Sequence, residues 1–358
     1  MSNGRLRVAV LDLNGPFGPL SSYAELAIPL ADSVELTCVV PQTRLSAVRG
    51  RFEGIRFVDF PSHGPVALQA ARTLRSLDPR PHLLHANSTS AIWPVALAAA
   101  ALRVPFVGHL RNSELSSQER LRIRIVDGLP LRSSFVAVSS LAAELAGLRS
   151  DRVEIVPDPV SESATRDVRQ VSDPAVIGAV VNQTPTKGLD TLVGVILDSR
   201  SANYRWRVFG SANVVNANAF VAEQHRLLDD AGAADRVEFC GEGLDLRREL
   251  PDLDALLITS RRESFSRVAV ESMLAGLPLI APDLAGLDET VSRGRYATTY
   301  PVSDATAAAA ALSQAISDYP AALRVALEAQ TYARDRFSPE VAADKMLKVY
   351  GEVLNRGH

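Results

Sequence analysis

The sequence predicts an α/β protein of two doubly wound domains, each a parallel β-sheet with helices on both faces. Short β-branched runs alternate along the chain with helical segments rich in alanine and leucine, a pattern typical of parallel sheets. With 358 residues, the chain is also longer than one hydrophobic core usually organises. The alternation stops once, in a polar stretch without periodicity at 161–174, and then resumes, which indicates a linker between two domains.

Each expected strand is a short apolar run. In the first half these runs are residues 7–13, 34–40, 55–60, 83–86, 105–109, 135–138 and 153–156. In the second half they are residues 176–181, 205–209, 237–239, 255–259, 279–281 and 297–300. The longest apolar block, 91–102, is far shorter than the roughly 20 residues of a membrane span, so a buried helix is expected there.

These runs define the expected domains. The first domain spans 1–162 and is completed by a C-terminal helix at 337–358, whereas the second spans 163–336. Ser338 can cap the final helix and Pro339 can occupy its first turn. Ligands of doubly wound sheets bind at the carboxyl ends of the strands. We therefore expect the two domains to face each other across a cleft lined by these loops.

The composition excludes several classes of protein. Hydrophobic residues at 47% and charged residues at 22% are ordinary globular proportions. A formal net charge of -3 disfavours nucleic acid or an anionic membrane as the main partner. Cys38 and Cys240 lie in separate apolar runs, so we interpret both as core residues. The N-terminus enters a strand pattern without a secretory leader, which together with the cysteines predicts a cytoplasmic protein.

The stretch from Ser260 to Glu289 carries the most informative pattern. It follows an expected strand and opens a helix, with Ser266 suited to the N-cap and a Gly-Leu-Pro step suited to the end. Backbone N–H groups around Ser264, Phe265 and Ser266 would point out of the helix start. The helix dipole favours negative charge at this point, so the pattern predicts a phosphate site.

Two glutamates flank this expected phosphate site, Glu263 before the helix and Glu271 on its second turn. A carboxylate can accept two hydroxyl hydrogen bonds at once, so each suits a vicinal diol of a ribose or hexose. A diphosphate between two sugars is the implied ligand. The alternative is that Glu263 is an exposed loop residue and Glu271 a solvent-facing helix residue, without a ligand. For either glutamate considered alone, this alternative is the preferred interpretation.

This stretch resembles the GT-B glycosyltransferases, specifically the retaining family 4, whose hallmark is E-x7-E followed by a small-Gly-x-Pro step. Glu263 and Glu271 match the pair, residues 275–278 match the step, and residues 285–289 match the loop after it. The resemblance implies that Glu263 contacts the transferred sugar, Glu271 the nucleotide ribose, and residues 264–266 the diphosphate.

A second motif, 184–190, follows the first strand of the second half. Lys187 can neutralise charge on a departing diphosphate, and the glycine after it allows close backbone approach. The family has this lysine and glycine, with an arginine five residues before the lysine, where this chain has Asn182. Asn182 can still donate hydrogen bonds. We expect Asn182 and Gly210 to bind substrate together with the residues named above. The alternative is a surface lysine in a turn.

The first domain is expected to supply the acceptor side and one wall of the donor site. Gly15 and Gly18 follow the first strand, where a flexible loop lets backbone approach a ligand, although a plain turn is equally compatible. The resemblance implies that His109, at the end of a strand, touches the donor sugar. Arg111 is expected to reach a phosphate or an acidic acceptor. An ordinary strand-end histidine is the alternative.

Two further patterns are interpreted as structural. Asp252 and Asp254 spell the DxD of metal-dependent transferases of another fold, but turn chemistry is the preferred interpretation. Arg120, Arg122 and Arg124 lie in an alternating apolar stretch, for which a solvated helix face is preferred over a membrane-surface segment.

The resemblance implies a retaining transfer in which the acceptor hydroxyl attacks the face from which the diphosphate leaves, with no enzymic nucleophile, metal or cofactor. The co-substrate would be a UDP- or GDP-type sugar, and the acceptor a sugar, lipid-linked or small molecule, with at most peripheral membrane contact. The alternatives are a catalytically silent nucleotide-sugar-binding protein and another enzyme of this fold, such as an epimerase. A nicotinamide dehydrogenase is disfavoured because no G-x-G-x-x-G follows a strand.

Overall fold

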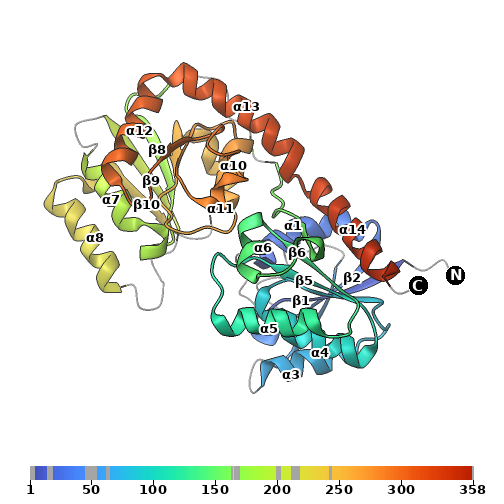
Figure 1. Ribbon diagram of the computed structural model, residues 1–358. Helices are drawn as coiled ribbons and strands as arrows, with labels where there is room; N and C mark the ends of the chain where they lie inside the picture. Colours follow the sequence, from blue (N-terminus) through green and yellow to red (C-terminus); the bar gives the residue numbers. More distant parts are fainter. Residues whose placement is uncertain are drawn as a thin grey trace. The chain divides into compact units, whose positions relative to one another are not determined.

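The computed structural model describes residues 5–13, 19–44, 55–61, 65–162, 164, 170–198, 203–210, 218–241 and 244–356. Tertiary contacts divide the chain into two compact units. Unit 1 comprises Met1–Ser161 and Phe337–His358, and unit 2 comprises Glu162–Arg336. Figure 1 shows that each unit is a twisted sheet with helices packed against it.

Unit 1 contains a seven-stranded parallel sheet in the order β3-β2-β1-β4-β5-β6-β7. Its strands are β1 (Leu6–Leu11), β2 (Val34–Pro41), β3 (Arg56–Phe60), β4 (Leu83–Ala86), β5 (Phe106–Leu110), β6 (Ser133–Ala137) and β7 (Val153–Ile155). Its helices are α1 (Pro19–Ala31), α3 (Val66–Arg75), α4 (Ile92–Leu102), α5 (Ser117–Gly128), α6 (Ser140–Ala146) and α14 (Pro339–Asn355).

The C-terminal helix α14 is part of the core of unit 1. Ser338 caps it by accepting a hydrogen bond from the Val341 N–H, and Pro339 occupies its first turn, as predicted. The buried face of α14, including Met346 and Tyr350, packs with α1 over one face of the sheet. Helix α4, which is the buried helix predicted from the apolar block, packs on the other face.

Unit 2 contains a six-stranded parallel sheet in the order β10-β9-β8-β11-β12-β13. Its strands are β8 (Ala175–Val180), β9 (Tyr204–Phe209), β10 (Val237–Gly241), β11 (Ala255–Leu257), β12 (Leu279–Pro282) and β13 (Thr298–Tyr300). Its helices are α7 (Leu189–Asp198), α8 (Asn218–Asp230), α9 (Leu246–Glu249), α10 (Arg267–Leu274), α11 (Ala285–Asp288), α12 (Ala305–Ser317) and α13 (Tyr319–Phe337).

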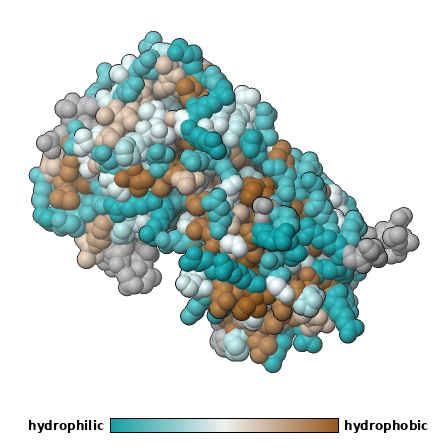
Figure 2. Space-filling view, in the orientation of Figure 1, coloured by the Kyte–Doolittle hydropathy of each residue, from teal (hydrophilic) through white to brown (hydrophobic). Residues whose placement is uncertain are grey.

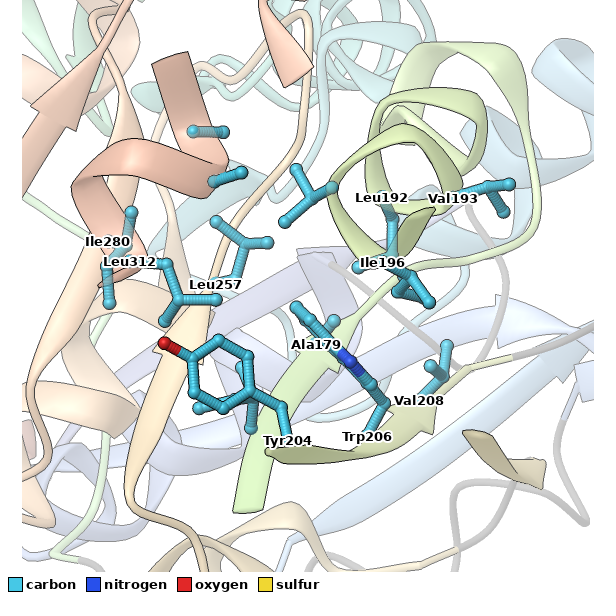
Figure 3. Close-up of a cluster of buried hydrophobic side chains, with 14 of the residues drawn as sticks. Ala179, Leu192, Val193, Ile196, Tyr204, Trp206, Val208, Leu257, Ile280 and Leu312 are labelled. Carbon is cyan, nitrogen blue, oxygen red and sulfur yellow. The ribbon is translucent and has the colours of Figure 1, made fainter. Parts of the chain in front are cut away.

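Two hydrophobic clusters cover the two faces of this sheet. Side chains of α7 and α12, among them Leu192 and Leu312, pack against Trp206 and Leu257 on one face (Figure 3). Ala269 of α10 and its neighbours pack on the opposite face. Helices α7 and α10 therefore leave the sheet in opposite directions from the adjacent strands β8 and β11.

The predicted fold class is confirmed, and every predicted strand is present. The strand ends differ by one or two residues, as at β11, which ends at Leu257 although the apolar run continues to Thr259. The ladder ends earlier because the chain turns there toward the loop before α10. Of the cysteines, Cys38 is buried as expected, whereas Cys240 is only partly buried.

The DxD sequence is structural, as the sequence interpretation favoured. Asp254 is fully buried, and its carboxylate accepts hydrogen bonds from the Val176 N–H at 2.8 Å and from Ser172 at 3.3 Å. Asp252 ends a short 3₁₀ turn. Asp254 therefore anchors the beginning of β8 and is not exposed to a ligand.

Candidate functional site

The candidate site of unit 2 lies where the strand order reverses. Strands β8 and β11 are adjacent in the sheet, but their following helices cover opposite faces. Such a switch point leaves a crevice at the carboxyl ends of the two strands, where α/β proteins bind ligands. The loops after β8 and β11 carry Lys187 and Glu263, respectively.

Lys187 is held by a short 3₁₀ turn, Pro185–Lys187. The Thr184 side chain caps this turn by accepting from the Lys187 N–H at 3.3 Å. The Thr259 hydroxyl donates to the Lys187 carbonyl oxygen at 3.0 Å and ties the turn to the loop after β11. Gly188 follows in the left-handed region, and a β-carbon there would lie 2.0 Å from the Thr259 carbonyl oxygen. Only glycine fits this close approach without displacing backbone.

Lys187 and Glu263 form an ion pair. The Lys187 Nζ donates to Glu263 Oε1 at 2.7 Å, and the two side chains are 32% and 13% exposed. These groups are 76 residues apart in the sequence. The predicted sugar-binding carboxylate and the predicted phosphate-binding cation therefore lie together at the switch point.

Helix α10 begins immediately after this loop. Ser266 is its N-cap, as predicted, and its hydroxyl accepts from the Ala269 N–H at 3.3 Å. The helix itself provides no acceptor for the N–H groups of Arg267 and Val268, because these belong to its first turn. Ser264 is partly buried, and Phe265 is 8% exposed. The chemistry at this helix start therefore suits an anion.

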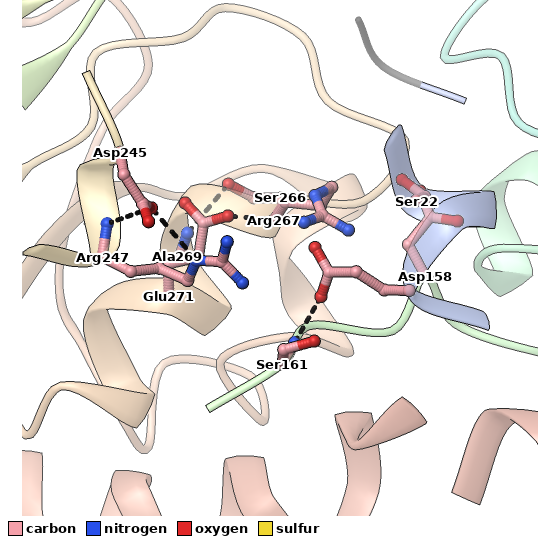
Figure 4. A network of polar contacts seen from close by, with 10 residues as sticks. Ser22, Asp158, Ser161, Asp245, Arg247, Ser266, Arg267, Ala269 and Glu271 are labelled. Atoms are coloured by element: carbon pink, nitrogen blue, oxygen red, sulfur yellow. Dashed lines mark hydrogen bonds and ion pairs between the residues drawn. The ribbon is translucent and has the colours of Figure 1, made fainter. Parts of the chain in front are cut away.

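Glu271 lies one turn into α10 on the same helix face as Arg267. The Arg267 Nη2 is 3.5 Å from Glu271 Oε1, and Figure 4 shows the two side chains extended toward each other. Glu271 is 13% exposed and Arg267 21%. Arg267 was not among the residues predicted for the site, although its i,i+4 spacing from the predicted ribose-binding Glu271 indicates that the two side chains are neighbours.

Residues 285–289 pack against the backbone of the Glu263 loop. Gly286 in α11 touches the backbone of the Glu263 loop so closely that a β-carbon would lie 1.7 Å from the Glu263 carbonyl oxygen. It would also lie 3.3 Å from the Ser264 nitrogen. The sequence matched this loop to a family pattern but did not reveal its physical role, because the contact joins segments on different strands.

Asn182 and Gly210 lie at the carboxyl ends of β8 and β9. Asn182 is exposed, and Gly210, with φ +128°, approaches the Val181 carbonyl, which a β-carbon would meet at 2.5 Å. Both positions share the sheet edge with Lys187. Their contact with a ligand stays a prediction.

In unit 1, His109 is a buried residue of β5. It is 1% exposed, its ring stacks on that of His85 with centroids 5.6 Å apart, and its Nδ1 lies 3.2 Å from Arg111 Nη2. Burial, reinforced by the positive charge of Arg111, lowers the pKa of His109 well below its usual value. The ring is therefore neutral, and because Arg111 can only donate, the His109 proton lies on Nε2.

The guanidinium of Arg111 is held inside unit 1. It donates to the Asn87 carbonyl and side-chain oxygens, each at 2.9 Å, and forms an ion pair with Asp158. Only 8% of Arg111 is exposed. The structure thus gives it a positioning role toward His109 and Asp158, and its predicted reach to a phosphate or acceptor stays untested. Gly15 and Gly18 lie outside the described residues.

A pair of polar residues that was not predicted from the sequence lies at the switch point of unit 1. Asp12 follows β1 and Asn87 follows β4, and the Asn87 amide donates to the Asp12 carboxylate. Both are at most 1% exposed. Asn87 directly follows an expected strand, whereas Asp12 lies within the expected strand 7–13, which ends at Leu11 in the structure.

Other features lie outside these sites. A cavity of about 310 Å³ opens at the amino ends of β12 and β13, lined by Arg295 and Asp318 among others, on the opposite edge of the sheet from Lys187. The described residues contain no cluster of three or more histidine, cysteine or acidic side chains that could hold a metal ion. Among the described helices, none combines the length and apolar character needed to cross a membrane.

Solved structures identify the fold as GT-B. HepE of Anabaena, solved in complex with UDP and glucose, superposes with a TM-score of 0.83 at 21% identity, covering 97% of this chain and 100% of that one. A sucrose-phosphate synthase of Thermosynechococcus elongatus gives a TM-score of 0.78 at 16% identity, covering 98% and 99%. The chain is therefore a GT-B-fold protein, as the sequence resemblance implied.

The family model of the glycosyl transferases group 1 matches residues 174–318, most of unit 2. The D-inositol 3-phosphate glycosyltransferase of Stackebrandtia nassauensis is 26% identical over 295 residues, 77% of this chain and 64% of that protein. A GDP-mannose-dependent phosphatidylinositol monomannoside mannosyltransferase of Mycobacterium tuberculosis is 29% identical over 178 residues, 46% and 44%. The matches thus span less than two thirds of either curated relative.

The close approach of Gly286 generates a stability prediction. Gly286→Ala forces the Glu263 backbone to move, so we expect it to lower the free energy of unfolding by about 1–3 kcal/mol. Gly351→Ala in α14 is the control, because a β-carbon there meets no atom within 4 Å. The control should raise stability by about 0.5–1 kcal/mol. Thermal unfolding of both variants checks this, and equal midpoints for Gly286→Ala and wild type would contradict it.

Burial of His85 generates a pH prediction. Its Nδ1 lies 2.7 Å from the Tyr350 hydroxyl, and burial lowers its pKa to about 3. Below pH about 6.5 the unfolded chain takes up a proton that the folded chain excludes, so stability falls as the pH falls. Between pH 7.5 and 5.5 this histidine should cost about 1.4 kcal/mol. Urea unfolding at both pH values measures this fall in the free energy of unfolding, which should be smaller by about 1.4 kcal/mol in His85→Gln. An equal fall in the variant and wild type would refute a lowered pKa of His85.

Proposed function

We propose that this protein transfers a sugar from a nucleoside diphosphate sugar to an acceptor hydroxyl with retention of anomeric configuration. The observation that carries the proposal is the meeting of Lys187 and Glu263 at the switch point of unit 2, beside the start of α10. A cation and a helix start suit a diphosphate, and the adjoining carboxylates suit sugar hydroxyls.

Each group then has a distinct task. The start of α10 at Ser264, Phe265 and Ser266, together with Lys187, stabilises the charge that develops on the leaving diphosphate. Glu271 accepts hydrogen bonds from the ribose. The retaining route proposed here uses no enzymic nucleophile, metal ion or cofactor, so the protein acts by positioning and electrostatics.

In unit 2, Glu263 accepts hydrogen bonds from hydroxyls of the transferred sugar. In unit 1, the neutral His109 carries its proton on Nε2, so its imidazole can donate a hydrogen bond to a sugar hydroxyl. Arg111 fixes the tautomer of His109 through Nδ1. The donor is of the UDP or GDP type, since the HepE structure holds UDP and the mycobacterial relative is named for GDP-mannose.

Donor binding is tested with Glu271→Ala. Wild-type protein should be stabilised against heat by UDP or by GDP, and the variant should bind that diphosphate roughly 10- to 100-fold more weakly, because charged hydrogen bonds to the ribose are lost. Glu238→Ala is the control: its carboxylate is 64% exposed and pairs with Arg207. Isothermal titration calorimetry gives the dissociation constants.

Absence of stabilisation by UDP, GDP and ADP alike would refute a donor site of this kind. Turnover separates the proposed transferase from a catalytically silent binding protein. Release of the nucleoside diphosphate from its sugar in the presence of acceptor favours the transferase. Tight binding without release on any acceptor would favour the silent protein.

Helix α5 favours an acceptor that is presented at an anionic lipid surface. Its outer face exposes Leu121 (58%) and Ile125 (44%), and Leu129, directly after the helix, is 40% exposed. Arg120 and Arg124 are exposed beside it. Figure 2 shows hydrophobic side chains next to hydrophilic ones over this part of unit 1. An apolar stripe between arginines is the pattern of a helix that lies in a lipid interface, whereas the sequence alone favoured a solvated face.

Vesicle binding tests this acceptor proposal. Wild-type protein should sediment with vesicles that contain phosphatidylglycerol and weakly with pure phosphatidylcholine, because each arginine near an anionic surface contributes about 1 kcal/mol. The double variant Leu121→Gln, Ile125→Gln should lose at least about five-fold in partition coefficient, since two apolar side chains no longer insert. Leu327→Gln on α13, also exposed, is the control. Equal sedimentation of the double variant and wild type would exclude α5 as the contact.

A further inference from the structure

Arg267 places a second cation in the candidate donor site. It is the first residue of α10, its side chain is only 21% exposed, and its guanidinium lies over the same helix face as Glu271. Residues four apart on a helix are neighbours on its surface, so Arg267 is fixed between the helix start and the carboxylate one turn further on.

The charge of the ligand calls for a second cation. A diphosphate bridging two sugars carries about two negative charges, and Lys187 supplies one positive charge beside it. The nearby Asn182 is neutral. Arg261 is committed elsewhere, since its guanidinium bonds Asp190, the Ser303 hydroxyl and the Pro185 carbonyl. Arg267 is the partly buried guanidinium at the helix start itself, and its planar fork suits bidentate binding of phosphate oxygens.

The two cations and the two carboxylates of the site are paired with one another. Lys187 pairs with Glu263 at 2.7 Å, and Arg267 pairs with Glu271 at 3.5 Å. The second distance exceeds the 2.7–2.9 Å of a charge-assisted hydrogen bond, so the Arg267–Glu271 contact is weaker than the Lys187–Glu263 contact. The site thus keeps its carboxylates compensated before ligand arrives.

Resting on the proposed function, we propose that Arg267 is a diphosphate-binding residue that Glu271 holds in reserve. When the donor binds, the diphosphate takes over Lys187 and Arg267, and the released Glu263 and Glu271 accept hydrogen bonds from the hydroxyls of the transferred sugar and the ribose. Phosphate recognition and hydroxyl recognition are thereby coupled. The coupling selects a nucleoside diphosphate over the corresponding monophosphate and nucleoside. Glu271 can bind the ribose only when its pair with Arg267 breaks, and a ligand without the second phosphate supplies no anion to bind Arg267 in its place.

The test compares a diphosphate, a monophosphate and a nucleoside of the same base on wild type, Arg267→Gln and Arg267→Lys. The base is uracil or guanine, whichever diphosphate binds wild type more tightly. Arg267→Gln should raise the dissociation constant of the diphosphate at least ten-fold, as measured by calorimetry. The dissociation constant of the nucleoside should change less than three-fold or fall, because Glu271 no longer pairs with Arg267. Arg267→Lys should recover part of the loss.

Arg226→Gln is the matched control, because Arg226 also forms an i,i+4 pair, with Asp230, but on the outer helix α8. It should bind all three ligands as wild type does. Equal diphosphate affinity in Arg267→Gln and wild type would overturn the inference while leaving the proposed function intact. Equal weakening of all three ligands would also overturn it, since that indicates a purely structural role. Wild type that binds neither diphosphate would instead refute the proposed function.

Discussion

The ion pair between Lys187 and Glu263 is the interaction on which the candidate site depends. It can form because β8 and β11 are adjacent in the sheet while α7 and α10 leave toward opposite faces, so the two loops diverge above the strands. A crevice at this point is a property of the topology. The ion pair places opposite charges at this switch point.

Close backbone packing fixes the positions of the loops that carry Lys187 and Glu263. Gly188 approaches the Thr259 carbonyl and Gly286 approaches the Glu263 carbonyl, at distances that any β-carbon would violate. These two contacts tie the lysine turn, the glutamate loop and α11 together without using a side chain. The side chains of Lys187 and Glu263 are consequently left available for a ligand, and their positions are set by backbone geometry, which is stiffer than a rotamer.

In unit 1, by contrast, the polar groups form a buried cluster around Arg111. Its guanidinium bonds Asn87, Asp158 and His109, and each partner would be costly to bury alone. The arrangement fixes a neutral His109 with a defined tautomer. Unit 1 therefore contains hydrogen-bond groups that are fixed by their neighbours, whereas unit 2 contains an ion pair at its switch point.

The sequence by itself determined the two parallel sheets, the strand positions, the start of the last helix at Ser338 and the cap at Ser266. These are local properties, because periodicity and capping involve residues within a few positions of one another. Only the tertiary structure decided that Lys187 meets Glu263, that Gly286 supports it, that Arg111 is committed internally and that α5 turns apolar residues outward. Each of these depends on which segments the sheet order brings together or leaves uncovered, and the chain encodes that order only through the packing of the whole core.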